Sequence, residues 1–160
     1  MIALTGWTVD GLLLAVQARA LDRSYDLVTV LIGVNDQFRG YPVAGYRQDF
    51  RFILGAAIEC AAGRPRRVIV LSIPDWGVTP FAAGEPRGEI AAMIDAYNEV
   101  NRQEAGEAGA RYVDLTRISR RAGSDRALIT YDGLHPSATM YQEWTGLILP
   151  QALETLGLTE

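Results

Sequence analysis

The stretch Asp-Leu-Val-Thr-Val-Leu-Ile-Gly-Val-Asn-Asp, residues 26–36, decides the fold. Its first seven residues form a short apolar run rich in β-branched side chains, which predicts a buried strand that ends at Gly33. Two later runs have the same character, Arg-Val-Ile-Val-Leu-Ser-Ile at residues 67–73 and Ala-Arg-Tyr-Val-Asp-Leu at residues 110–115. Continuous apolar runs of this length are typical of strands that are buried on both faces of a parallel sheet.

Longer segments with helical spacing separate these strands. We expect helices over residues 9–22 with Thr8 as N-cap, over residues 45–62 and 89–107, and over residues 137–156 with Pro136 at or near the first turn. Strands that alternate with single helices require crossover connections and place a parallel sheet between two helix layers. The predicted fold is therefore an α/β, flavodoxin-like three-layer α/β/α sandwich in one domain over residues 1–160.

The beginning of the chain does not fit a complete sheet of this kind. A sheet of three strands would leave the first one, residues 26–32, with an unpaired apolar edge, which proteins avoid. Met1-Ile2-Ala3-Leu4 resembles the tail of another strand. We therefore expect that the domain lacks its first βα unit, roughly 30 residues or more, upstream of Met1.

Composition excludes several classes of function. The chain has 160 residues, 49% of them hydrophobic and 21% charged, and a net charge of −4, which is typical of a globular protein. It has no long basic run, so nucleic acid is not an expected partner. Cys60 is the only cysteine, so we expect neither an internal disulfide nor a cysteine-based metal site, and we interpret Cys60 as a buried small residue.

Membrane and export signals are also missing from the sequence. No apolar run reaches the roughly 18 residues of a membrane span. No signal peptide is visible, which favours a cytoplasmic location, although the expected missing start leaves room for a signal peptide upstream of Met1. The oligomeric state is open.

The most informative polar motif is Tyr-Asp-Gly-Leu-His-Pro at residues 131–136, which contains His135, the only histidine. Asp132 can accept a hydrogen bond from one ring nitrogen of His135, which leaves the other nitrogen free to take a proton from a nucleophile. Taken alone, Asp-x-x-His before a helix could equally be a capping arrangement.

Three segments in this order resemble a known family. They are Leu-Thr-Gly-Trp-Thr at residues 4–8, Leu-Ile-Gly-Val-Asn-Asp at residues 31–36, and Asp-Gly-Leu-His-Pro at residues 132–136. Together they resemble the SGNH (GDSL-type) hydrolases, a family of esterases and lipases. Val-Leu-Ser-Ile-Pro-Asp-Trp-Gly at residues 70–77 is similar to a strand exit of lysophospholipase-like members. The resemblance covers the whole chain and implies an ester substrate, either small or lipid-like, with no metal and no organic cofactor.

The resemblance also assigns roles to residues of this chain. It implies His135 as the base, Asp132 as the acid that orients it, and Gly6 and Asn35 as the donors of an oxyanion hole. Gly6 could instead serve only as a helix-entry turn, and Asn35 could simply brace a turn. Further side chains near these motifs could line a substrate pocket or merely pack their loops, and these are Asp36, Phe38, Arg39, Tyr41, Asp75, Trp76 and Phe81.

The nucleophile of the family is missing. In the family it is the serine of a Gly-Asp-Ser motif after the first strand, and no Gly-Asp-Ser occurs in this chain. The chain has five serines, and none is in a suitable place: Ser24, Ser72, Ser119, Ser124 and Ser137. Ser137 is better explained as the start of a helix.

Two rival interpretations follow. The chain could be a catalytically silent fragment or a binding remnant that keeps the pocket without the nucleophile. It could also bind a phosphate or nucleotide, as flavodoxin-like proteins do, but no glycine-rich phosphate loop follows any expected strand.

Overall fold

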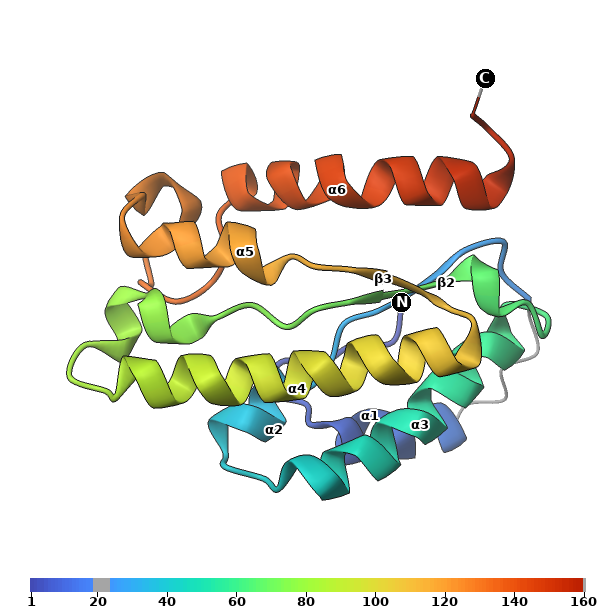
Figure 1. The fold of residues 1–160 in the computed structure, drawn as a ribbon, viewed down its shortest axis with the longest axis horizontal. Helices are drawn as coiled ribbons and strands as arrows, with labels where there is room; N and C mark the ends of the chain where they lie inside the picture. Colours follow the sequence, from blue (N-terminus) through green and yellow to red (C-terminus); the bar gives the residue numbers. More distant parts are fainter. Residues whose placement is uncertain (19–23, 160) are drawn as a thin grey trace.

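The computed structural model describes residues 1–18 and 24–159, which form a parallel sheet with helices on both faces (Figure 1). The strands are β1 (Val28–Val30), β2 (Val68–Leu71) and β3 (Arg111–Val113), in the spatial order β1-β2-β3. Both pairings are parallel, with Val30 opposite Val70 and Val70 opposite Tyr112. The carboxyl ends of all three strands therefore meet at one end of the sheet, where loops can bring polar groups together.

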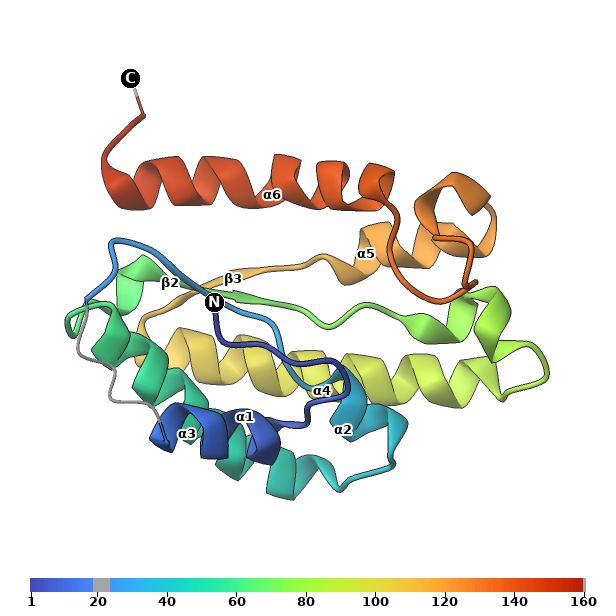
Figure 2. The same ribbon diagram turned by 180° about the vertical axis from the view of Figure 1, so that it is seen from behind.

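The helices form two layers (Figures 1 and 2). One layer contains α1 (Val9–Gln17), α3 (Val43–Cys60) and α4 (Arg87–Ala108), and the other contains α5 (Thr116–Ser119) and α6 (Ala138–Leu156). The short helix α2 (Val34–Phe38) follows β1 directly. Short 3₁₀ turns complete the connections: Pro65–Arg67, Trp76–Val78, Pro80–Ala82, Arg120–Gly123 and Arg126–Leu128.

The central strand explains why its sequence is apolar throughout. Val68 and Val70 pack into the core shared with α3 and α4, whereas Ile69 and Leu71 pack into the core shared with α6. All four side chains are buried. Because successive side chains of a strand point to opposite faces, β2 gives two residues to each core and so joins the two layers.

The elements follow the sequence expectation with shorter strands. Each strand is expected to be six or seven residues long, but only three or four residues of each are paired. The expected helix over residues 9–22 ends at Gln17 as α1, and residues 19–23 lie outside the described residues. The other three helices agree with their expected ranges to within two residues. The three-layer α/β architecture is confirmed.

Two helix starts illustrate the local chemistry. Ser137 is the N-cap of α6, where its hydroxyl accepts a hydrogen bond from the Met140 N–H at 3.3 Å, as the sequence predicts. Thr8 occupies the N-cap position of α1, but its hydroxyl donates to Asp10 and not to the helix. The Val9 N–H is instead accepted by both carboxylate oxygens of Asp36, each at 3.1 Å. Thr8 is therefore the N-cap residue, as predicted, but its side chain makes no cap hydrogen bond, and a carboxylate distant in sequence accepts the first N–H of the helix.

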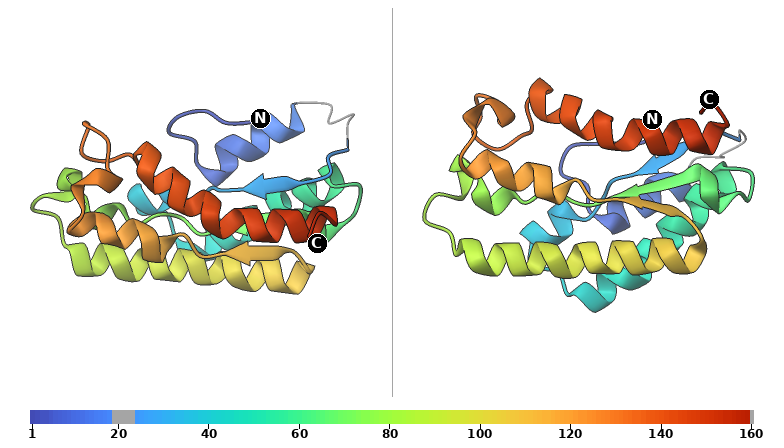
Figure 3. Two further views of the ribbon diagram at one scale, coloured as in Figure 1. Left: turned by 90° about the horizontal axis from the view of Figure 1, so that it is seen from above. Right: turned by 45° about the horizontal axis from the view of Figure 1, so that its top comes forward.

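The outer edge of β1 is open within the described residues, where β2 is its only strand neighbour. β1 and β3 lie at opposite edges of the sheet, with α6 passing over it (Figure 3). An apolar groove of about 150 Å³ runs between the N-terminal segment and the end of β1, and its lining includes Ile2, Leu4, Leu31 and Ile32. No helix of the described residues is long and apolar enough to cross a membrane.

Candidate active site at the carboxyl end of the sheet

Asp132 and His135 form a tight turn before α6. The turn is closed by a bridge between Ile129 and Pro136 and by a hydrogen bond from the Thr130 N–H to the His135 carbonyl at 2.9 Å. One carboxylate oxygen of Asp132 lies 2.6 Å from Nδ1 of His135. The motif that the sequence singles out is therefore a directly paired carboxylate and imidazole.

The other carboxylate oxygen of Asp132 fixes the pair in place. It accepts hydrogen bonds from the Thr130 hydroxyl at 2.6 Å and from the backbone N–H groups of Leu134 and His135 at 2.9 and 3.0 Å. These donors, the Thr130 hydroxyl foremost, hold the pKa of Asp132 well below its usual range. Asp132 is therefore an ionised acceptor at neutral pH.

This arrangement decides which ring nitrogen of His135 can act. Because an ionised carboxylate can only accept, the proton of the neutral imidazole sits on Nδ1, and Nε2 is left with a lone pair. The His135 side chain is 64% exposed, so Nε2 can reach a substrate or a nucleophile. The pair therefore has the geometry that a general base requires.

Asn35 lies on α2, which begins at a strained turn. Gly33 is the N-cap of α2 with φ +115°, and a Cβ at this position would lie 2.5 Å from the Tyr46 hydroxyl oxygen. The Tyr46 hydroxyl also donates a hydrogen bond to the Ile32 carbonyl at 3.1 Å, so the Tyr46 side chain packs directly against this turn. The Asn35 side-chain amide donates one hydrogen bond to the Trp7 carbonyl at 2.9 Å, which leaves its second N–H available.

Gly6 lies beside Asn35 because of two hydrogen bonds between their segments. The Asn35 amide binds the carbonyl of Trp7, the residue after Gly6, and the Arg39 guanidinium donates to the Gly6 carbonyl at 2.8 Å. Gly6 has φ +81°, which favours glycine. Within the described residues, the Gly6 N–H has no hydrogen-bond acceptor. Two unused N–H donors, one on Gly6 and one on Asn35, therefore belong to adjacent segments.

The expected pocket residues have different surroundings. Asp36 is only 1% exposed and ties α2 to the start of α1, so it faces the protein interior, and burial raises its pKa. Arg39 is a brace for Gly6. Phe38 and Trp76 contact one another with ring centroids 5.1 Å apart, and the Trp76 indole donates to Gln37 at 2.6 Å.

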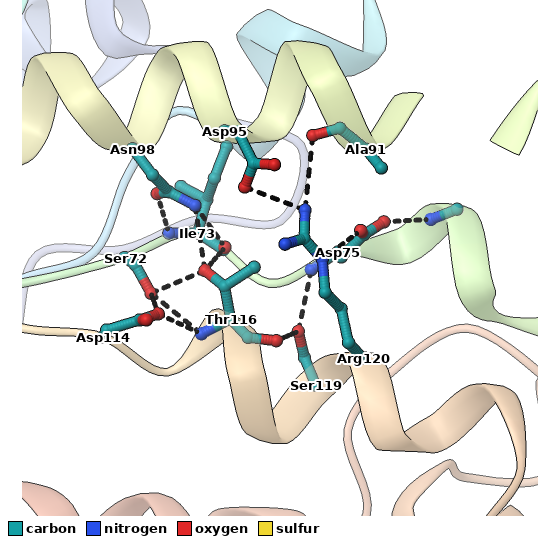
Figure 4. A network of polar contacts seen from close by, with 11 residues as sticks. Ser72, Ile73, Asp75, Ala91, Asp95, Asn98, Asp114, Thr116, Ser119 and Arg120 are labelled. Atoms are coloured by element: carbon teal, nitrogen blue, oxygen red, sulfur yellow. Dashed lines mark hydrogen bonds and ion pairs between the residues drawn. The ribbon is translucent and has the colours of Figure 1, made fainter. Parts of the chain in front are cut away.

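Behind the site, a polar network joins the exits of β2 and β3 (Figure 4). Asp114 braces the neighbouring loops, because its carboxylate accepts from the Ser72 hydroxyl at 3.2 Å and the Thr116 N–H at 2.9 Å. Asp75 is buried and paired with Arg120 at 2.9 Å, and Arg120 also reaches Asp95 at 2.8 Å. Asp75 therefore supports the loop after β2 rather than a substrate.

The same network accounts for two of the five serines. Ser72 is fully buried, and its hydroxyl oxygen accepts from the N–H groups of Leu115 and Thr116 at 2.7 and 3.0 Å. Ser119 is also buried, donates to the Thr116 carbonyl at 2.8 Å and accepts from the Asp75 N–H at 2.9 Å. Neither hydroxyl is positioned to attack a substrate.

The other three serines are equally unsuited. Ser24 precedes β1 and so lies at the opposite end of the strand from Asn35. The Ser124 hydroxyl lies 3.3 Å from the Arg121 carbonyl, and the Ser137 hydroxyl donates to the Ala127 carbonyl at 2.5 Å. In the described part of the chain no serine hydroxyl is hydrogen-bonded to His135, whose ring is paired with Asp132.

Two supporting residues escaped sequence reasoning. Thr130 lies two residues before Asp132, and only the folded turn reveals that its hydroxyl holds the carboxylate. Gln37 looks like an ordinary polar residue in the sequence, but it is buried and anchors Trp76. A serine or threonine two residues before an Asp-x-x-His motif is the signal that could have pointed to Thr130. Among the described residues, no group of three or more His, Cys, Asp or Glu side chains could hold a metal ion.

Comparison with known proteins places this site in a family. The GDSL-like Lipase/Acylhydrolase family matches residues 1–143. The chain belongs to this family. The resemblance drawn from the three sequence motifs is therefore confirmed, and the family is one of ester hydrolases. No curated protein matches the chain.

Solved structures share the fold at low sequence identity. An acylhydrolase-like protein from Bacteroides fragilis has a TM-score of 0.71 and 18% identity over 94% of this chain and 72% of its own. The acetylxylan esterase Axe2 from Geobacillus stearothermophilus has a TM-score of 0.67 and 20% identity, covering 96% and 69% of the two chains. TesA has a TM-score of 0.66 and 21% identity, covering 93% and 73%. Catalytic mutants of Axe2 replace one histidine or one serine with alanine.

Proposed function

We propose that this chain carries most of the active site of a serine ester hydrolase that works through an acyl-enzyme. His135 is the base, Asp132 orients it, and the Gly6 N–H with the Asn35 amide binds the oxyanion. The observation that carries the proposal is the 2.6 Å contact between the Asp132 carboxylate and Nδ1 of His135, which leaves Nε2 free. Membership in a family of ester hydrolases supports the same chemistry.

The nucleophile is a serine that none of the five serines in residues 1–160 provides. Each of them is buried, engaged in another hydrogen bond, or at the wrong end of the sheet. We infer that the serine comes from a segment outside these residues, as part of a Gly-Asp-Ser motif. The open edge of β1 and the apolar groove beside Asn35 provide room for a strand that could deliver it.

The reaction then follows from the donors and acceptors of the site. The serine hydroxyl gives its proton to Nε2 of His135 while its oxygen bonds to the ester carbonyl carbon, and the carbonyl oxygen becomes the oxyanion. The alcohol leaves with the proton from His135, and the acyl group stays on the serine. Water repeats the sequence through His135, which releases the carboxylic acid and restores the serine.

Asp132 and the oxyanion donors act at different moments of this cycle. Asp132 stays ionised throughout and stabilises the imidazolium that forms when Nε2 takes the proton. The two N–H donors meet a full negative charge only in the tetrahedral intermediates, so their contribution is largest in the transition states that flank them.

A rescue experiment tests the proposal. The 160-residue chain should show little or no hydrolysis of a short-chain aryl ester. The chain extended before Met1 by a strand ending in Gly-Asp-Ser should hydrolyse it, and serine-to-alanine and His135→Ala versions of the extended chain should both lose that activity. Equal, His135-dependent turnover by the unextended chain would show that another group is the nucleophile.

The alternative is a catalytically silent binding remnant. It is favoured by the observation that no serine hydroxyl in residues 1–18 and 24–159 is hydrogen-bonded to His135. In that case the extended chain would bind esters and still fail to hydrolyse them. The coding sequence upstream of Met1 discriminates at lower cost, because an in-frame strand followed by Gly-Asp-Ser supports the enzyme.

A further inference from the structure

Three aromatic side chains gather beside the candidate active site. The ring centroids of Phe38 and Trp76 are 5.1 Å apart, those of Phe38 and Phe81 are 6.1 Å apart, and those of Trp76 and Phe81 are 6.2 Å apart. Phe38 and Phe81 are 52% and 50% exposed. The three rings, called the aromatic platform below, therefore leave a contiguous apolar surface in contact with water.

The aromatic platform connects the two halves of the site. Phe38 lies three residues after Asn35 on α2, so it shares that helix with the candidate oxyanion donor. The Phe81 N–H donates to the carbonyl of Gly133 at 3.0 Å, and Gly133 lies between Asp132 and His135. The aromatic platform is therefore joined to Asn35 through α2 and to the Asp132–His135 turn through the Phe81 backbone.

The platform is held rigidly although it is exposed. The Trp76 indole is fixed by its 2.6 Å hydrogen bond to the buried Gln37. The Phe81 backbone is held by its hydrogen bond to the Gly133 carbonyl, and the two segments pack closely, because a Cβ on Gly133 would lie 3.3 Å from Pro80 Cβ. The Phe81 ring itself packs against Phe38 and Trp76. Fixed aromatic rings lose little side-chain entropy when an apolar group covers them, which favours binding.

We propose that the aromatic platform binds a hydrocarbon substituent of the ester, an alkyl chain of several carbons. An alkyl chain on either the acyl or the alcohol side of the ester would cover the same rings, and the experiment below distinguishes the two. Acetyl esters of sugars, whose substituents are small or polar, would leave the platform exposed. This proposal rests on the proposed function, because it places the ester between Asn35 and His135.

Ligand binding to the 160-residue chain tests the platform without catalysis. The probes are methyl hexanoate, hexyl acetate and, as a short control, methyl acetate, titrated against the chain while the indole N–H signals are followed by NMR. We expect both six-carbon esters to shift the Trp76 signal with saturation, and methyl acetate to bind at least about tenfold more weakly. A larger effect of methyl hexanoate than of hexyl acetate would assign the platform to the acyl side, and the reverse to the alcohol side.

Matched variants make the test specific. Phe38→Ala and Phe81→Ala should each raise the dissociation constant of the six-carbon esters by about 3–10-fold, the usual value of one aromatic contact. Phe38→Leu, which keeps apolar area, should restore much of the affinity. Phe52→Ala is the control, because Phe52 lies on α3 outside the platform and is 59% exposed.

Two results would overturn the proposal. One is equal binding of six-carbon esters to Phe38→Ala, Phe81→Ala and Phe52→Ala. The other is a signal that moves at Trp7 and not at Trp76, which would place the ligand in the groove along β1. Failure of the proposed function looks different, since the extended chain would then lack hydrolysis while the platform variants still weakened binding.

Discussion

Gly33 is the residue at which substitution conflicts most directly with the structure. Gly33→Ala should lower the free energy of unfolding by roughly 2–4 kcal/mol, because it combines backbone strain at φ +115° with a Cβ 2.5 Å from the Tyr46 oxygen. Urea unfolding measures this. Gly40→Ala is the control, since Gly40 has φ +71° but no atom within 4 Å of a Cβ, and it should lose only the strain. Equal losses in the two variants would show that the Tyr46 contact has no effect.

Thr130 gives a second residue-scale prediction, which concerns pH. Its hydroxyl is the main cause of the lowered pKa of Asp132, so Thr130→Val should raise that pKa while Thr130→Ser should not. A folded-state pKa below the unfolded value means that the pair stabilises the fold above about pH 3.9 and loses this effect as pH falls through the folded pKa. The measurement is an NMR titration of the Asp132 carboxyl in the unsubstituted chain, Thr130→Val and Thr130→Ser. An unchanged Asp132 pKa in Thr130→Val would show that the Thr130 hydroxyl is not the main cause of the lowered pKa.

Single residues were predictable where their effect is local. Ser137 as a helix start and Asp132 beside His135 follow from spacings of a few residues, and the structure has both contacts. The partners of Asp36 and Gln37 come from segments about 30 to 40 positions away. No local pattern contains that information, so the sequence could not show that Asp36 is buried.

At the scale of elements, long periodic segments were predictable and short ones were not. The central strand and the helices α3, α4 and α6 have clear patterns and lie close to the expected ranges. The helices α2 and α5, with five and four residues, are too short to show a period, and no helix was expected at either place. Strand lengths were overestimated because apolar patterning continues past the residues that pair.

Asp36 joins two helices, because it lies on α2 and its carboxylate binds the first N–H of α1. Asp36→Ala would leave the Val9 N–H buried without an acceptor and should destabilise the protein by roughly 1–3 kcal/mol. Hydrogen exchange should increase most in α1. Asp10→Ala is a suitable control, because Asp10 is exposed and binds only the Thr8 hydroxyl among side chains. If amide hydrogen exchange in α1 were equally fast in Asp36→Ala and Asp10→Ala, the Asp36 carboxylate would not stabilise the start of α1.

At the scale of the whole molecule, the open edge of β1 should make the isolated chain self-associate. β1 and the following Leu31, which is 42% exposed, present an apolar edge without the charges that normally prevent pairing. Size-exclusion chromatography should show oligomers or a broad distribution, and Leu31→Arg should shift it toward monomer. A sharp monomer peak with a cooperative, high-temperature melt would contradict this expectation.

The layers and the family could be predicted at this scale, whereas the aromatic platform could not. Alternating strands and helices determine the order of layers, and three motifs indicate the family. The contact of Phe38 with Trp76 and Phe81 depends on how two loops pack after different strands. Loop packing is set by tertiary contacts, so the proposed substrate preference could be argued only from the structure.

The most direct test of the account is the kcat and KM of Asn35→Ala in the extended, active chain. In the proposed mechanism Asn35 offers one N–H to the oxyanion, and its other N–H binds the Trp7 carbonyl. Removing the side chain should therefore lower kcat by about 10²–10³ and change KM little. An unchanged kcat would contradict the central claim, because Asn35 would then serve only the turn between β1 and α2.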